Sequence, residues 1–161
     1  MLSTLPLSAV AATLSFSPSS ASVASGQTVT VSVLVSSADQ AMNATAGVVS
    51  FPNDKLEVVS VSKAGSISTL WVQEPSYSNS GGTVSFEGVT PNPGFTGASG
   101  KVVSITFRGK GEGAANLSFA SGSVLANDGR GTELYTGGRG ATITVGGAAP
   151  VPIAPSAPTG K

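Results

Sequence analysis

The chain has 161 residues, of which 40% are hydrophobic and only 10% are charged, with eight basic and eight acidic side chains. This length suits one domain with a substantial core. The charge balance excludes the basic face that a nucleic-acid-binding protein or an electrostatically bound membrane protein needs. The lack of Cys and His excludes disulfides, thiolate nucleophiles, His/Cys zinc sites and Ser-His-Asp triads.

The first segment, residues 1–12, reads MLSTLPLSAVAA and ends in an A-x-A pattern at residues 9–11. This is typical of the end of a secretory signal, although the positively charged start of such a signal is missing. The alternative is an unstructured N-terminal extension. We therefore expect an exported protein, secreted or at the cell surface. No apolar run has the length of a transmembrane helix, so membrane attachment would need an anchor outside these residues.

Hydrophobic residues recur with a period of two along most of the chain, which predicts strands and no helix. The predicted strands are, in chain order, residues 14–16, 29–35, 46–51, 56–61, 67–72, 83–88, 101–108, 115–126 and 139–145. Residues 75–82 and 90–100 are predicted connections, and the strand at 115–126 is expected to be bulged or broken at Gly122. The alternation predicts a core that contains the odd-numbered valines of residues 29–35 and five phenylalanines: Phe16, Phe51, Phe86, Phe107 and Phe119.

About nine short strands separated by Gly, Pro, Asn and Asp favour an all-β sandwich over a βαβ fold. The predicted domain spans residues 13–146. Residues 147–161 contain prolines at 150, 152, 155 and 158, which predicts an extended, semi-rigid linker or tail.

Four segments, in order and at matching spacing, resemble the bacterial cohesin domain over about residues 13–145. They are GQTVTVSVLV (26–35), SFPNDKLEVVSVSKAGSI (50–67), GKVVSITFRGKGEG (100–113) and SVLANDGRGTEL (123–134). The loop at residues 92–97 is richer in Gly than the cellulosomal pattern, so the resemblance is to the broad cohesin-like group. It implies a jelly-roll β-sandwich related to some carbohydrate-binding modules.

The resemblance also implies a non-catalytic protein-binding module, in which one sheet face receives a small helical partner, the dockerin. On this chain that face would include residues 46–50, 67–72, 83–87 and 117–119. The candidate partner contacts are Trp71, Gln73, Ser85 and Glu87. A register error of one residue would move each of them to the opposite face.

No set of residues predicts catalysis. Glycosidases need two carboxylates across a sugar-sized gap, and the best pair here, Glu74 and Glu87, has no supporting His, Lys pocket or nucleophile. We therefore expect no enzymatic activity and no organic cofactor.

Three residues after the next-to-last predicted strand are compatible with either a calcium site or a turn. They are Asn127, Asp128 and Glu133. Calcium prefers carboxylate and carbonyl oxygens, whereas Asp-Gly is also a common turn. The pattern favours the turn.

Three aromatic residues at strand ends or in loops, Trp71, Tyr77 and Tyr135, are candidates for stacking on sugar rings or for anchoring a protein interface. Trp71 is equally compatible with a half-buried position in the sandwich. Two other functions therefore stay open: a carbohydrate-binding module, and a structural subunit of a surface layer, adhesin or extracellular filament that pairs through exposed strand edges.

Overall fold

The computed structural model describes residues 10–148, and every regular element in that range is a β-strand. The strands are β1 (Ala12–Ser17), β2 (Ser20–Ser25), β3 (Thr28–Ser50), β4 (Leu56–Ser62), β5 (Leu70–Ser78), β6 (Thr83–Val89), β7 (Phe95–Gly109), β8 (Gly113–Ala126), β9 (Tyr135–Gly138) and β10 (Ala141–Ala148). The all-β prediction is confirmed. The signal-like segment and the Pro-rich tail lie almost wholly outside the described residues. Within them, no helix is long and apolar enough to cross a bilayer.

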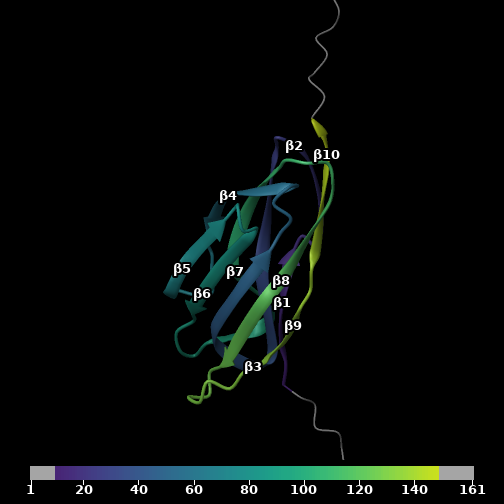
Figure 1. Cartoon of the computed structure of the whole chain (residues 1–161). Helices are drawn as coiled ribbons and strands as arrows, with labels where there is room; N and C mark the ends of the chain where they lie inside the picture. The colour runs from purple at the N-terminus through teal and green to yellow at the C-terminus, as the bar shows by residue number, and fades with distance from the viewer. Residues whose placement is uncertain (1–9, 149–161) are drawn as a thin grey trace, which may run out of the picture.

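Strand β3 organises the two layers of the sandwich (Figure 1). Its first half pairs with β1 and β7, and residues 44–50 pair with β6 and β8. One layer therefore contains β5, β6, β3 and β8, and the other contains β4, β7, β3, β1 and β9. Strand β10 pairs with β8 and β2, which links the layers along one side. The result is a jelly-roll sandwich.

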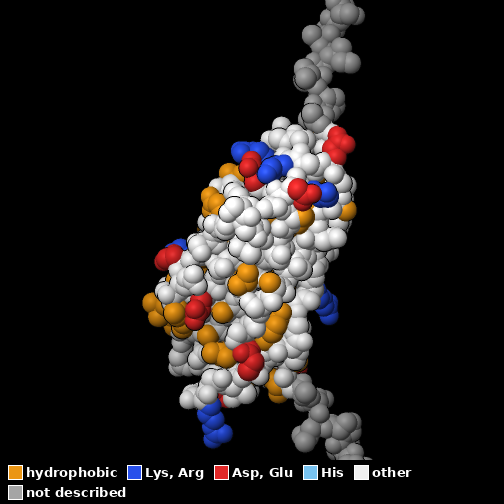
Figure 2. Space-filling view, in the orientation of Figure 1, with side chains coloured by type: hydrophobic (Ala, Val, Ile, Leu, Met, Phe, Trp, Pro, Cys, Tyr) orange, Lys and Arg blue, Asp and Glu red, His pale blue; other side chains and the backbone are white. Residues whose placement is uncertain are grey.

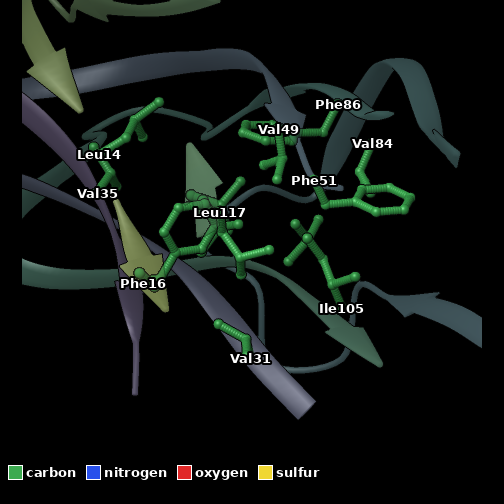
Figure 3. Packing of buried hydrophobic residues seen from close by; sticks show 14 of the residues in the cluster. Leu14, Phe16, Val31, Val35, Val49, Phe51, Val84, Phe86, Ile105 and Leu117 are labelled. Atoms are coloured by element: carbon green, nitrogen blue, oxygen red, sulfur yellow. The ribbon is translucent and has the colours of Figure 1, made fainter. Parts of the chain in front are cut away.

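The core lies between the two layers, where alternate residues of facing strands meet (Figure 3). Val31, Val33 and Val35 of β3 are fully buried, as the alternation predicts, and Ile105 and Phe107 of β7 pack beside them. Burial of each such side chain contributes roughly 1.5–3 kcal/mol, which explains how a chain without disulfides holds this fold.

Phe119 corrects the predicted core. It is only half-buried, because it lies at the margin of the sandwich and stacks on Phe16 with ring centroids 4.4 Å apart. The other four predicted core phenylalanines are buried, whereas Val29, the first of the four predicted core valines, is only partly buried.

Several predicted boundaries are wrong for one reason, namely that strands continue through residues that usually end them. β5 runs through Pro75 to Ser78, and β7 begins at Phe95, inside the predicted loop. The start of β5 is a separate error, since β5 begins at Leu70 and not at residue 67. β8 is continuous past Gly122, and its irregularity lies opposite Val48 and Val49. Two predicted strands merge into β3, and the sequence analysis missed β2 and β9, so ten strands replace about nine.

Candidate functional site

The outer face of the β5–β6–β3–β8 layer is built from rows of residues that lie directly opposite one another on adjacent strands. Such residues share a face of a sheet. In strand order β5, β6, β3 and β8, the two central rows are Gln73–Glu87–Ala46–Ser123 and Ser76–Ser85–Val48–Ser121. The flanking rows are Leu70–Val89–Ala44–Leu125 and Ser78–Thr83–Ser50–Ser118.

This outer face is hollowed at its centre. A shallow cavity of about 300 Å³ lies over the two central rows and is lined by residues of all four strands. Its lining includes the small outward side chains Ala46 and Ser85, with Gln73 and Glu87 toward the β5 side and residues 121–123 toward the β8 side. A hollow of this kind can receive side chains that project from a partner surface.

The charge of this face is negative. Within the four described rows, Glu87 carries the only charge, and Glu133 adds a second carboxylate beside β8 through a hydrogen bond of 2.6 Å from the Ser123 hydroxyl. Partial burial, which would raise the pKa of Glu133, is outweighed by hydrogen bonds from Ser123 and from the N–H groups of Val124 and Tyr135. The pKa of Glu133 therefore lies below its ordinary value.

Apolar side chains border the hollow along β5. Leu70 and Val72 are 60% and 68% exposed, and Leu70 belongs to the apolar flanking row Leu70–Val89–Ala44–Leu125, so the exposed apolar surface here is contiguous. Figure 2 shows hydrophobic side chains gathered over the β5–β6 side of the molecule, amid a surface that is mostly neither charged nor hydrophobic.

Three of the four predicted partner contacts come together on this face: Gln73, Ser85 and Glu87 all line the hollow. Trp71 does not join them. It pairs with Gly88 and lies on the inner side of β5, where it is half-buried against the core and lies under the ammonium of Lys63, 5.8 Å from the ring centroid.

The cause is a β-bulge at Val72. In a regular strand, residues 71 and 73 point to the same side. Here their partners, Gly88 and Glu87, are consecutive on β6, so Val72 is an extra residue on β5 and Trp71 and Gln73 point to opposite sides. The sequence analysis also missed Ser121, Gly122 and Ser123 of β8, because the Ser-Gly-Ser run indicated a break and no surface position.

The other candidate aromatics do not form a row. Tyr77 is exposed at the β5 edge, and its hydroxyl donates to the carbonyl of Val59 in β4. The Tyr135 ring lies against Gly122, where a Cβ would meet it at 2.5 Å, and partial burial raises the pKa of its phenol. The coplanar aromatic stripe of a sugar-binding face is therefore not built from the described Trp and Tyr residues.

The three candidate calcium ligands have protein partners. The Asp128 carboxylate accepts hydrogen bonds from the Thr132 hydroxyl and the Arg130 N–H, and these lower its pKa. The Asn127 amide donates to Asn92 and to the carbonyl of Pro93. In residues 10–148 no group of three or more His, Cys, Asp or Glu side chains converges on one point. The arrangement fits the turn and does not fit a calcium shell.

A family model described as the cohesin domain matches residues 14–145. The chain belongs to the cohesin-domain family. The match covers all ten strands in part or in full, and it confirms the resemblance given by the four sequence segments. Comparison with curated proteins gave no match.

Solved cohesin structures share the fold at low sequence identity. The cohesin in the Coh-OlpC–Doc435 cohesin–dockerin complex of Clostridium thermocellum has a TM-score of 0.72 at 10% identity, covering 90% of this chain and 99% of that chain. The seventh ScaB type I cohesin of Pseudobacteroides cellulosolvens gives 0.69 at 19% identity, covering 88% and 96%. The solution structure of CaCohA2 from Clostridium acetobutylicum gives 0.68 at 19%, covering 86% and 94%.

Proposed function

We propose that this cohesin domain is a non-catalytic protein-binding module whose β5–β6–β3–β8 face binds a dockerin. The observation that carries the proposal is the hollowed outer face, with its exposed apolar border at Leu70 and Val72. Family membership supports the class of partner, because structurally similar cohesins are described in cohesin–dockerin complexes.

The chemistry of the face indicates what the partner presents. Two carboxylates, those of Glu87 and Glu133, would attract Lys or Arg, and the serine hydroxyls of β6 and β8 would hydrogen-bond with polar side chains. Leu70 and Val72 would bury apolar side chains of the partner at the β5 edge. A helix with small polar residues and one or two basic residues on its exposed face fits this surface.

We further propose that the domain acts outside the cell, as a secreted or surface-bound module. The low charged fraction and the Ser/Thr-rich surface support this location, as do the signal-like residues 1–12. The Pro-rich residues 147–161 would then separate the domain, residues 13–146, from a neighbouring part of an extracellular assembly.

Calorimetric titration with purified dockerins from the source organism tests the proposal. Two matched variants, Ser121→Arg and Ser60→Arg, add a large cation at an exposed serine beside a strand irregularity, and neither serine makes a side-chain hydrogen bond within the protein. Ser121 lines the hollow, whereas Ser60 lies on β4 in the other layer.

We expect at least one dockerin to bind, Ser121→Arg to weaken that binding at least tenfold, and Ser60→Arg to leave it unchanged. The proposed face is wrong if both variants bind equally well. The dockerin class is wrong if no dockerin of the organism binds the wild-type domain.

A further inference from the structure

The interior of the sandwich contains three hydroxyl groups without a hydrogen-bond partner in the protein, those of Thr45, Ser68 and Thr90. The three residues are 0%, 3% and 7% exposed. A buried hydroxyl that makes no hydrogen bond is disfavoured, because it has lost its bonds to water without replacement.

The three residues are neighbours of Gly88 of β6. Thr45 is the cross-strand neighbour of Gly88, which puts its Cβ about 5 Å from the place of a Gly88 Cβ. The Oγ of Ser68 lies 2.7 Å from that same place. Thr90 follows Gly88 by two residues, so alternation turns its side chain to the same inner side, and its N–H donates to the carbonyl of Asn43.

The segment that carries Ser68 is fixed on both sides. The Ile67 N–H donates to the carbonyl of Lys101 in β7, and the Thr69 N–H donates to the carbonyl of Val89 in β6. The Trp71 ring closes the site from β5, because its Cζ3 lies 2.9 Å from the place of a Gly88 Cβ. These two bonds hold the backbone of the segment in place, and Ser68 is 3% exposed there.

We infer that Gly88, Thr45, Ser68 and Thr90 form an internal water site between the two layers. Each hydroxyl can donate one hydrogen bond and accept two, and water matches that pattern from every direction. No carboxylate is among the residues that line the site, so the lining suits a neutral ligand. Buried waters in globular proteins typically make about three hydrogen bonds to groups of this kind.

Water-to-amide NOE spectra of the full chain, together with a high-resolution crystal structure, test this site. We expect NOEs from a long-lived water to the amide protons around Thr45 and Gly88. We also expect an ordered water at about 2.6–3.2 Å from at least two of the three hydroxyl oxygens. A dry site in the crystal and no such NOEs would overturn the inference.

The variants Thr45→Val and Ser68→Ala supply a second readout that does not depend on the crystal. Each substitution removes one hydroxyl group and leaves the size and shape of the side chain nearly unchanged. Thr69→Val is the matched control, because Thr69 is exposed and lies next to Ser68. A bound water predicts that the double variant loses the NOEs and has a lower Tm than wild type, whereas the control keeps both. If Thr45→Val instead raises the Tm, its hydroxyl was unsatisfied and the site holds no water. If the double variant does not fold, the wild-type spectra decide.

Discussion

Asn79 joins the open edges of the two layers, and its removal gives a sharp test of how this sandwich is held together. Strand β4 pairs only with β7, so no strand forms a backbone ladder with the other edge of β4. The side-chain amide of Asn79 makes hydrogen bonds there that a neighbouring strand would otherwise make. Its Oδ1 accepts a hydrogen bond from the Val58 N–H at 2.7 Å, and its Nδ2 donates to the Val58 carbonyl at 3.0 Å.

The expected cost of Asn79→Ala follows from these two bonds. Val58 is 3% exposed, so its backbone groups have little access to replacement water. A net loss of about 1 kcal/mol per hydrogen bond, with a further penalty for buried groups left unpaired, gives about 2–3 kcal/mol. For a domain of this size that corresponds to a fall in Tm of roughly 6–12 °C.

Urea denaturation followed by Trp71 fluorescence measures the free energy of unfolding, and hydrogen exchange measures protection of the Val58 amide. Asn116→Ala is the control, since this exposed residue accepts one side-chain hydrogen bond, from Thr142, and we expect it to change stability by less than about 0.5 kcal/mol.

Asn79→Asp keeps the acceptor for the Val58 N–H but puts a carboxylate oxygen beside the Val58 carbonyl. It should therefore be destabilising at neutral pH and partly recover when the carboxylate is protonated. The reasoning is refuted if Asn79→Ala is as stable as the control and the Val58 amide stays equally protected.

Three further substitutions test other parts of the structure. Because the pKa of Glu133 is lowered in the folded domain, the ionised Glu133 stabilises the fold above its ordinary pKa of 4.5, and this stabilisation is lost as the pH falls through the folded-state pKa. Glu133→Gln should therefore make the free energy of unfolding fall less steeply at acid pH. An unchanged fall would contradict this prediction. Gly122→Ala should destabilise by about 1–3 kcal/mol in urea unfolding, because the new Cβ meets the Tyr135 ring. The same substitution should cost less in a Tyr135→Ala background, and an equal cost in both backgrounds would contradict the clash. Phe119→Ala should cost about 2–3 kcal/mol, less than a fully buried Phe, through loss of its stacking on Phe16, with thermal unfolding as the measurement.

The core could be predicted from the sequence because burial repeats along each strand with a period of two. Val31, Val33, Val35, Ile105 and Phe107 follow that period without interruption, and all five are fully buried. Strand ends were harder to predict. Pro75 lies inside β5, which is possible because β5 pairs only with β6, and an edge strand tolerates a residue without an N–H.

The candidate face shows the same division between regular and irregular strands. Ser85 and Glu87 belong to β6, which pairs with β3 without a register shift, so their common face follows from their spacing. Trp71 and Gln73 are separated by the bulge at Val72, and no residue in Trp-Val-Gln marks a bulge in the sequence. The side that each of them faces depends on how β5 pairs with β6, which is tertiary information.

The alternation in β3 also separates stability from binding within one strand. Val49 points into the core and is fully buried, while its neighbours Val48 and Ser50 point outward into the rows of the candidate face. An outward substitution can therefore change the partner surface and leave the core intact. Because Glu87 and Glu133 are the only charged residues described on this face, long-range electrostatic attraction would contribute little to the association with a partner. On this surface the selection of a partner would depend mainly on the shape of the hollow, on the serine hydroxyls around it and on contact with Leu70 and Val72.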